Sequence, residues 1–380
     1  MKIVIVGPAH PLRGGLAAYN ERIAKAFIDA GHQVVIYTFS MQYPKLLFPG
    51  KSQYSNQPPP SLNIKVCINS INPFNWIKVA QKIKKENADI LLVKFWLPFM
   101  APCFGTINRL GRTKNKTTVV SIIDNIIPHE KRLGDKILAN YFVKSVDGFI
   151  AMSQSVLTDL QKFDNSKPKL FSPHPLYDNF GPALNRPDAI KHLGLDPQFE
   201  YILFFGFIRP YKGLEVLLEA MANTEIKSRN IKLIVAGEFY TDRAPYDALI
   251  EKHQLQQTVL MHTDFIPDDK VRYYFCASHL VVQPYTHATQ SGVTQICYHF
   301  NIPMLVTNVG GLPEMVPHNQ VGYIAQPDAA DVAHYILKYF DENKEQNFVQ
   351  NIIQYKTRYD WQVMVDKVFE IASLHKNKYK

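Results

Sequence analysis

Residues 201–221, YILFFGFIRPYKGLEVLLEAM, contain the pattern that decides the fold. The apolar run at the start is typical of a buried parallel strand, and LEVLLEAM at the end has helical spacing of apolar residues. Between them, a turn that contains glycine places Arg209 and Lys212 just after the strand, where the helix begins. Strand, turn and helix form the repeating unit of a doubly wound α/β sheet, in which ligands bind beyond the carboxyl ends of the strands.

The same alternation of strands and helices extends in both directions from this stretch. In the second half, strands are expected at residues 232–237, 258–265, 279–285 and 303–308, and helices at 244–253, 268–277 and 291–300. In the first half, a helix is expected at residues 15–31, and strands at 2–7, 33–39, 63–68, 88–95, 117–124 and 148–153. Because 380 residues exceed one ordinary α/β core, the two blocks predict two Rossmann-like, doubly wound domains.

The join between the blocks is expected in the stretch 175–200, which is rich in proline and polar residues. We therefore expect a first domain at residues 1–180 and a second at 181–360. The last stretch, DWQVMVDKVFEIASLH at residues 360–375, has the pattern of an amphipathic helix. We expect residues 361–380 to form a C-terminal helix that packs back on the first domain.

The charge of the chain is unevenly distributed. Residues 1–185 contain 23 Lys and Arg against 11 Asp and Glu, a net charge of +12, whereas the remainder has a net charge of −3. This asymmetry indicates that the first half faces an anionic partner, such as nucleic acid, a membrane surface or a phosphorylated acceptor. No recognisable nucleic-acid motif accompanies the charge, so we do not expect nucleic acid as a partner.

The composition also bears on location and metal binding. The first apolar run, KIVIVG, is too short for a signal peptide, and Lys94, Pro98 and Pro102 argue against a spanning helix at residues 88–107. We therefore expect a cytoplasmic protein. The four cysteines lack metal-ligand spacing and the chain has no DxD motif, so neither a metal site nor a cofactor is expected.

Four loops that follow expected strands contain residue types suited to binding an anion or a sugar. Gly14 and Gly15 allow a ligand to approach the start of a helix, although a plain tight turn has the same composition. Arg209 and Lys212 could converge on a diphosphate, or form a solvated surface pair. A helix is expected to start at Gln290, Ser291, Gly292, Val293 and Thr294. Its backbone N–H groups could bind phosphate oxygens, or the helix is simply well capped by these residues. Asp124 and His129 are candidates for hydrogen bonding to a sugar or for proton transfer.

The order of these motifs resembles the large retaining glycosyltransferase family 4, of the GT-B fold, over nearly the whole chain. The matching pieces are the Gly14-Gly15 loop, GHQVVIYT at 31–38, GFIRPYKGLEVLLEA at 206–220, the region from QPY to VGGLPEMV at 283–316, and VGYIAQP at 321–327. The resemblance implies two Rossmann-like domains that face one another across a cleft. It also implies a nucleotide-sugar donor held mainly by the second domain and an acceptor held mainly by the first.

The resemblance assigns roles residue by residue. Arg209 and Lys212 match the basic pair that binds the diphosphate, and residues 291–294 match the phosphate-binding helix start. Glu314 lies in the VGGLPE segment. Two departures stand out. Gln290 lies near the first of two glutamates usual in the family, and Ile296, beside Gln295, lies at the second. Asp124 occupies the place of the family's histidine in the first domain.

The sequence therefore predicts a metal-independent hexosyltransferase, in which positioning and electrostatics supply the catalysis. The candidate catalytic residues are Asp124, His129, Arg209 and Lys212. The expected partners are a nucleotide sugar and a glycan or lipid-linked acceptor. Two alternatives stay open: a sugar-nucleotide epimerase of the same fold, and a catalytically inactive subunit that binds nucleotide sugars.

The basic first half also predicts peripheral association with an anionic membrane, at its inner face. Lysines cluster at residues 78, 82, 84 and 85, and a second basic cluster comprises Arg109, Arg112, Lys114 and Lys116. Between them, the segment FWLPFM at residues 95–100 follows a strand and could form an apolar tip. The competing interpretation is that this segment belongs to the core and that the lysines form a solvated helix face.

Overall fold

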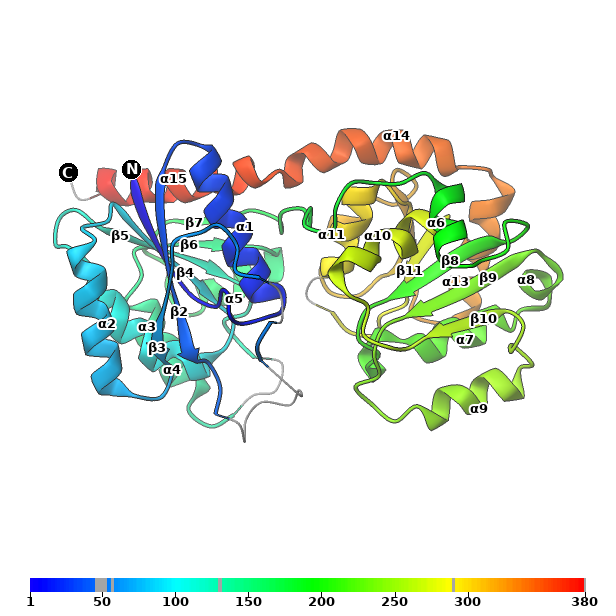
Figure 1. Cartoon of the computed structure of the whole chain (residues 1–380), viewed down its shortest axis with the longest axis horizontal. Coiled ribbons are helices and arrows are strands. Elements are labelled where there is room, and N and C mark those ends of the chain that lie inside the picture. Colours follow the sequence, from blue (N-terminus) through cyan, green and yellow to red (C-terminus); the bar gives the residue numbers. More distant parts are fainter. Residues whose placement is uncertain (45–52, 56–57, 129–131, 289–290, 379–380) are drawn as a thin grey trace. The chain divides into compact units, whose positions relative to one another are not determined.

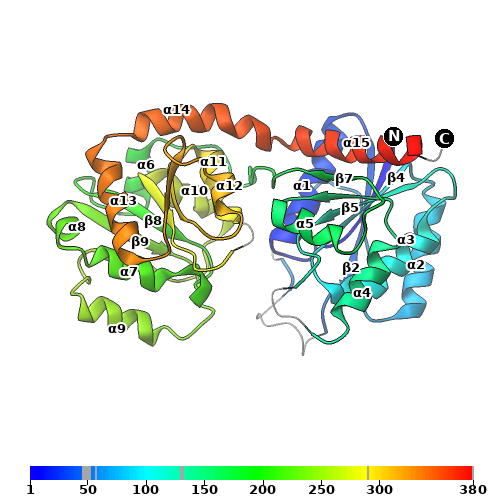
Figure 2. The same ribbon diagram turned by 180° about the vertical axis from the view of Figure 1, so that it is seen from behind.

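The computed structural model describes residues 1–44, 53–55, 58–128, 132–288 and 291–378. The chain divides into two compact units. Unit 1 comprises Met1–Pro173 and Trp361–Lys380, and unit 2 comprises His174–Asp360. Each unit contains a parallel sheet with helices on both faces (Figures 1 and 2). The boundary between the two units therefore lies after Pro173, whereas the sequence pattern predicted it after residue 180.

The sheet of unit 1 has seven parallel strands in the order β3-β2-β1-β4-β5-β6-β7. The strands are β1 (Lys2–Val6), β2 (Gln33–Met41), β3 (Ile64–Asn69), β4 (Ile90–Phe95), β5 (Thr118–Ile123), β6 (Gly148–Ala151) and β7 (Lys169–Phe171). The order changes direction between β1 and β4. An open α/β sheet binds its ligand at such a reversal, outside the carboxyl ends of the strands.

The helices of unit 1 form one layer on each face of this sheet. Side chains alternate along each strand, so Ile3 and Ile5 pack in one core and Val4 and Val6 in the other. One layer consists of α1 (Gly15–Asp29) and α15 (Trp361–Lys378). The other consists of α2 (Pro73–Lys85), η2 (Pro98–Met100), α3 (Ala101–Gly111), α4 (Asp135–Val143) and α5 (Gln154–Gln161).

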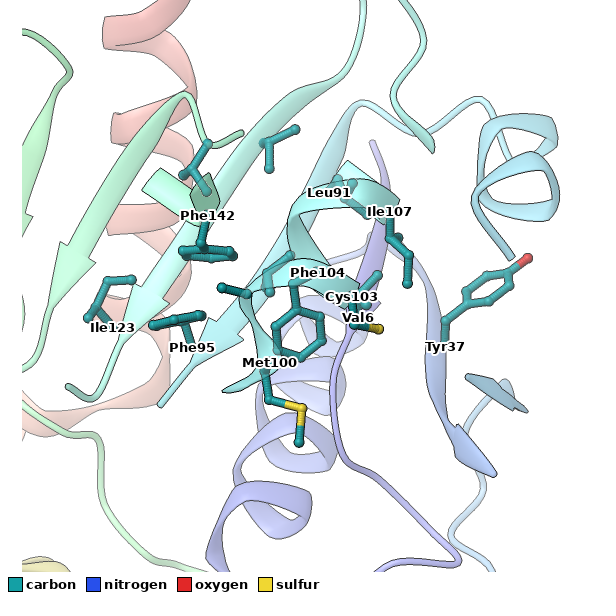
Figure 3. Close-up of a cluster of buried hydrophobic side chains, with 14 of the residues drawn as sticks. Val6, Tyr37, Leu91, Phe95, Met100, Cys103, Phe104, Ile107, Ile123 and Phe142 are labelled. Carbon is teal, nitrogen blue, oxygen red and sulfur yellow. The ribbon is translucent and has the colours of Figure 1, made fainter. Parts of the chain in front are cut away.

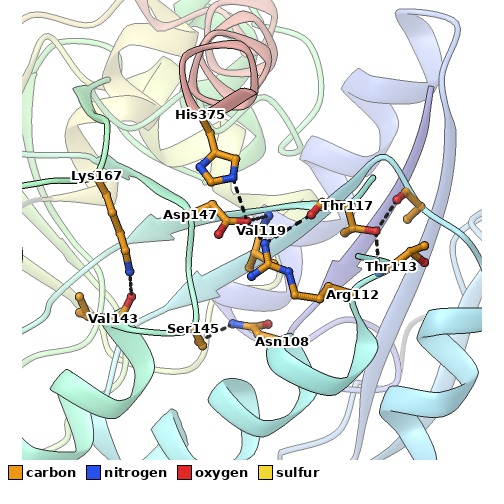
Figure 4. A network of polar contacts seen from close by, with 11 residues as sticks. Asn108, Arg112, Thr113, Thr117, Val119, Val143, Ser145, Asp147, Lys167 and His375 are labelled. Atoms are coloured by element: carbon orange, nitrogen blue, oxygen red, sulfur yellow. Dashed lines mark hydrogen bonds and ion pairs between the residues drawn. The ribbon is translucent and has the colours of Figure 1, made fainter. Parts of the chain in front are cut away.

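Helix α15 is bound to unit 1 by apolar and polar contacts. The ring of Trp361, its first residue, lies 5.0 Å from the ring of Tyr19 on α1. Near its end, His375 Nε2 lies 3.8 Å from the carboxylate of Asp147, which also accepts a hydrogen bond from Arg112 (Figure 4). The last stretch of the chain thus completes the first unit although 187 residues of unit 2 precede it.

The segment at residues 95–100 does not form an apolar tip, so that expectation is wrong. Phe95 and Met100 are fully buried in the core between the sheet and helices α3 and α4 (Figure 3). The rings of Phe95 and Phe142 stack with centroids 4.0 Å apart. The physical reason is the position of β4 in the middle of the sheet, because the chain passes directly from β4 into η2 and α3, which cover it.

The second basic cluster is also used inside unit 1. Arg112 pairs with Asp147 (Figure 4), and Arg109 donates hydrogen bonds to the carbonyl oxygens of Gly105 and Tyr141. These arginines hold helices and loops of the unit together.

The sheet of unit 2 has six parallel strands in the order β10-β9-β8-β11-β12-β13. They are β8 (Glu200–Phe205), β9 (Ile231–Ala236), β10 (Val259–His262), β11 (Leu280–Gln283), β12 (Met304–Thr307) and β13 (Gly322–Ala325). Here the order reverses between β8 and β11. The sequence YILFFGFIRPYKG therefore leads from β8 to the place where an open α/β sheet binds its ligand.

Two helical layers cover this second sheet. One contains α6 (Arg186–His192), α10 (Asp268–Ala277), α11 (Gly292–Phe300), α12 (Leu312–Met315) and α14 (Glu345–Tyr355). The other contains α7 (Leu214–Met221), α8 (Thr224–Ser228), α9 (Ala244–Lys252) and α13 (Ala329–Asp341). The family resemblance predicted this arrangement of two doubly wound domains, and the structure confirms it.

Candidate active site

In unit 2, the loops that follow β8 and β11 are tied together at the switch point. The backbone N–H of Thr286 donates a 2.8 Å hydrogen bond to the carbonyl of Tyr211. Gly213 has a φ of +65°, and a Cβ atom at this position would lie 2.0 Å from the carbonyl oxygen of Pro284. Only glycine allows this approach, so the glycine of the RPYKG motif joins the two loops.

Lys212 lies on the short helix η3 (Pro210–Lys212), with its ammonium group beside the end of β8. A Cβ atom on Gly206 would lie 2.8 Å from Lys212 Nζ and 4.0 Å from Cγ2 of Val293 on α11. Burial lowers the pKa of Lys212; the neighbouring Tyr211 opposes this shift, and the charge of Arg209 adds to it. The side chain therefore lies in a place that disfavours its own positive charge until an anion arrives.

Arg209 precedes η3 and is exposed. Its guanidinium lies 5.2 Å from the ring centroid of Tyr240, and Lys212 Nζ lies 5.4 Å from that of Tyr285. Within the described parts of the chain, neither cation forms an ion pair with a carboxylate. Two uncompensated cations near one another, with aromatic rings beside them, suit a bound diphosphate.

Helix α11 begins beside Lys212. Its N-cap, Ser291, makes no side-chain capping hydrogen bond, and its hydroxyl lies 3.3 Å from that of Tyr285. Gly292 is exposed, and a Cβ atom there would lie 2.8 Å from the ring of Tyr177. The first turn thus presents N–H groups that no side chain caps, and the helix dipole adds positive potential at the same place.

The side chain of Thr294 does not point toward a ligand at the helix start, and the role of its backbone N–H stays a prediction. Its side chain is fully buried and donates a 3.2 Å hydrogen bond to Oε1 of Gln283 at the end of β11. The amide nitrogen of Gln283, Nε2, is buried and has no hydrogen-bond partner among the described residues. The same holds for both polar side-chain atoms of Gln295. Gln283 was not predicted from the sequence, and Gln295 was considered only as the neighbour of Ile296, although polar residues inside apolar elements were a visible signal.

The two remaining residues predicted for this site have different outcomes. Glu314 is exposed on α12, which follows β12 at the carboxyl edge of the same sheet. Gln290 lies outside the described residues. The roles of both stay predictions.

In unit 1, Gly14 and Gly15 lie at the start of α1 and are exposed. Gly14 has a φ of +105°, and its carbonyl accepts hydrogen bonds from Ala17 and Ala18. A Cβ atom on Gly14 would meet nothing within 4 Å. The glycine is therefore required by the left-handed backbone that starts the helix and leaves open space around the helix start.

Asp124 follows β5 and is tied to the neighbouring strand β4. Its Oδ1 accepts a 2.7 Å hydrogen bond from Lys94 Nζ, and its backbone N–H donates to the carbonyl of Phe95. The Lys94 side chain is 3% exposed and its ammonium lies 3.6 Å from the ring centroid of Tyr19. Burial lowers the pKa of Lys94, and the charge of Asp124 opposes that shift. Asp124 therefore belongs to a partly buried ion pair, whether or not it also contacts a substrate.

From the sequence, Lys94 was considered only as a residue that argues against a membrane span. A lysine inside the apolar strand ILLVKF was the signal for a buried partner such as Asp124. His129 lies outside the described residues, so its role stays a prediction. In the described ranges, no helix is long and apolar enough to cross a membrane.

Two family models match the chain. The model described as Glycosyltransferase Family 4 matches residues 13–171, and the model described as Glycosyl transferases group 1 matches residues 185–357. The first covers most of unit 1 without α15, and the second most of unit 2.

Curated relatives span most of the chain at low identity. A D-inositol 3-phosphate glycosyltransferase of Thermobifida fusca is 24% identical over 361 residues, which are 85% of this chain and 80% of that protein. An N-acetyl-alpha-D-glucosaminyl L-malate synthase of Bacillus anthracis is 21% identical and covers 91% of this chain and 90% of its own. Both names describe glycosyl transfer or a product that contains a sugar.

Solved structures show the same fold. The Anabaena protein Alr3699/HepE, in complex with UDP, aligns with a TM-score of 0.75 at 18% identity and covers 98% of this chain and 100% of its own. A glycosyltransferase from Rickettsia africae aligns with a TM-score of 0.74 at 19% identity, with 98% of each chain covered.

Proposed function

Since the chain belongs to glycosyltransferase family 4, with the GT-B fold, we propose that it transfers a hexosyl unit from a nucleotide-diphosphate sugar to a glycan or a lipid-linked acceptor. The observation that carries this proposal is the uncompensated charge of Lys212. The side chain lies between the loop after β8 and the start of α11, where three sources of positive potential meet: Lys212, Arg209 and the helix N-terminus. A nucleotide diphosphate supplies the missing anion, and UDP is bound by the Anabaena protein of the same fold.

In the proposed reaction, the bond between the anomeric carbon and the β-phosphate oxygen breaks, and the acceptor hydroxyl forms a new bond to the same carbon. The hydroxyl proton passes to the departing phosphate oxygen. We propose that transfer proceeds with retention and needs no protein nucleophile. Negative charge grows on the diphosphate as it leaves, so Lys212, Arg209 and the N–H groups of α11 stabilise the transition state more than the ground state.

Asp124 has a more limited part in this proposal. Lys94 holds one of its oxygens, so the carboxylate is fixed at the carboxyl edge of the first sheet. From that position it can accept a hydrogen bond from a sugar hydroxyl. We further propose that the enzyme is cytoplasmic and binds lipid-linked acceptors at an anionic membrane surface. The positive net charge of the first half of the chain supports this.

The experiment is a panel of nucleotide sugars, scored first by thermal shift and then by transfer to candidate acceptors. A donor that binds the folded protein raises its melting temperature according to its affinity and concentration. We expect one class of nucleotide sugar to stabilise the protein and to be consumed when an acceptor is added. Conversion of the donor to an epimer without any acceptor would instead indicate the epimerase, and binding without turnover an inactive subunit.

A further inference from the structure

Apolar side chains are exposed at the carboxyl edge of the first sheet. Phe74 is 77% exposed at the start of α2, and Ile77 and Ile71 beside it are 42% and 50% exposed. At the start of α4, Leu133 and Ile137 are 107% and 75% exposed. We call these five residues the apolar rim.

The rim lies on one helical layer. Helix α2 follows β3 and α4 follows β5, so both helices begin at the carboxyl ends of parallel strands. Helix α3 packs between them, as Figures 1 and 2 show. With roughly 10 Å between neighbouring helix axes, the rim is about 20 Å wide. Such an exposed apolar edge is unfavourable in water unless another surface covers it.

Lysines lie along the two helices that begin at the rim. Lys78, Lys82, Lys84 and Lys85 on α2 are all exposed, and so are Lys136 on α4 and Lys144 immediately after it. Phe74, Lys78 and Lys82 are spaced by four residues and share one face of α2. At 1.5 Å per residue, Lys82 lies about 12 Å along the helix from Phe74.

In the part of the chain that the structure describes, the acidic side chains next to these lysines form no ion pair with them. Glu86, at the end of α2, pairs with Lys2 and Lys65, and Asp135 accepts a hydrogen bond from the backbone of Arg132. Among the described residues, the four lysines of α2 form no ion pair. The excess of positive charge around the rim is therefore not cancelled locally.

We propose that the apolar rim and the lysines of α2 and α4 dock unit 1 on an anionic lipid bilayer. The rim side chains enter the boundary between headgroups and acyl chains, and the ammonium groups contact lipid phosphates. Charge complementarity favours an anionic bilayer, because this surface combines the apolar rim with lysines, and residues 1–185 carry a net charge of +12. This surface replaces the buried segment 95–100 as the membrane contact. It rests on the proposed function only for the lipid-linked acceptor, which it would present at the edge that carries Asp124.

The test is sedimentation with vesicles of phosphatidylcholine alone, or of phosphatidylcholine with phosphatidylglycerol, without any donor sugar. We expect binding that needs the anionic lipid and weakens with added salt. Each lysine near an anionic surface is worth about a fivefold change in partition, so the variant Lys78→Gln/Lys82→Gln should bind about 25-fold more weakly. The variant Phe74→Gln/Ile137→Gln should lose tenfold or more.

Matched controls lie on the opposite helical layer of the same unit. Lys25 on α1 and Lys376 on α15 are exposed, as are Ile28 and Leu374 at 42% and 44%. The variant Lys25→Gln/Lys376→Gln removes the same charge as Lys78→Gln/Lys82→Gln. The variant Ile28→Gln/Leu374→Gln replaces the same number of apolar side chains, which are 42% and 44% exposed where Phe74 and Ile137 are 77% and 75% exposed. We expect both to bind vesicles like the unchanged protein.

The proposal is overturned if neutral and anionic vesicles bind equally, if the control variants lose as much binding as the rim variants, or if neither vesicle binds. The last result would leave an acidic protein as the occupant of the rim. A thermal shift with the nucleotide sugar separates this proposal from the proposed function. Vesicle binding without donor binding supports the docking surface and contradicts the transferase, and the reverse result contradicts the docking surface alone.

Discussion

A lysine lies near the carboxyl end of a central strand in each unit, and the two lysines have opposite surroundings. Lys94 in unit 1 is buried on β4 and pairs with Asp124 at 2.7 Å. Lys212 in unit 2 is partly buried beside Gly206, and its charged neighbour is another cation, Arg209. Burial lowers the pKa of both lysines, but only Lys94 has a carboxylate that opposes the shift.

The difference separates stability from function. A charge that the protein neutralises itself contributes to a defined core, and removing one partner leaves the other buried and unpaired. A charge that the protein leaves uncompensated is unfavourable in the free state and favours an anionic ligand. We therefore expect changes at the first lysine to affect folding, and changes at the second to affect the reaction.

The largest expected effect is on stability, from Asp124→Ala. Without the carboxylate, the buried ammonium of Lys94 has no counter-charge, and the free energy of unfolding should fall by about 3–5 kcal/mol. Urea unfolding measures this. The variant Lys94→Met/Asp124→Leu removes both charges and should recover most of the loss. An Asp124→Ala protein as stable as the unchanged one would show that the pair is not the structural element described.

The same double variant also tests the role of Asp124 in the reaction. If it folds and retains full transfer activity, Asp124 is structural only.

The next effect is on the reaction, from Lys212→Ala or Arg209→Ala. Loss of one cation that contacts the buried diphosphate should cost about 2–5 kcal/mol, which is roughly 30- to several-thousand-fold in kcat/KM. The free energy of unfolding should stay nearly constant, because neither cation has a carboxylate partner among the described residues when no ligand is bound. Lys252→Ala, at the exposed end of α9, is the matched control. Unchanged kinetics in Lys212→Ala would falsify the assignment of this site.

A smaller effect is expected from pH. Because burial lowers the pKa of Lys212 below the ordinary value of 10.5, the ammonium loses its proton at a lower pH than an exposed lysine does. Donor affinity should therefore decrease several-fold as the pH rises toward 10.5, and the break should lie below that value. Isothermal titration with the stabilising nucleotide sugar measures it. In Lys212→Arg the break should disappear, since a guanidinium keeps its charge. A break at the same pH in that variant would assign the titration to another group.

The smallest expected effect is that of EDTA, which should leave transfer activity unchanged. In other transferases a divalent ion provides the positive charge that stabilises the leaving diphosphate. Here that charge is proposed to come from Arg209, Lys212 and the start of α11. Initial rates in excess EDTA, with and without added magnesium or manganese, decide the question. Loss of activity that either metal restores would mean that the cations of unit 2 are insufficient by themselves.

The local patterns in the sequence were sufficient for the α/β class, the two blocks and the loops that carry the candidate residues. KIVIVG and YILFFGF form strands because both faces of a parallel sheet are covered, so their residues are apolar without alternation. RPYKG marks a strand-to-helix loop because its glycine adopts a positive φ at the start of α7. These are properties of neighbours in the chain, and sequence reveals them directly.

Burial and pairing depend on distant parts of the chain, and only the tertiary structure decided them. FWLPFM has the composition of a membrane tip and of a core segment alike, and the central position of β4 made it core. Lys94 and Asp124 are 30 residues apart, and they pair because β4 and β5 are adjacent in the sheet. Lys212 lacks a counter-charge for the corresponding reason, since the loops after β8 and β11 bring it a helix start and aromatic rings instead of a carboxylate. The sequence determined which residues can ionise, and the fold determined which of those charges are left for a ligand.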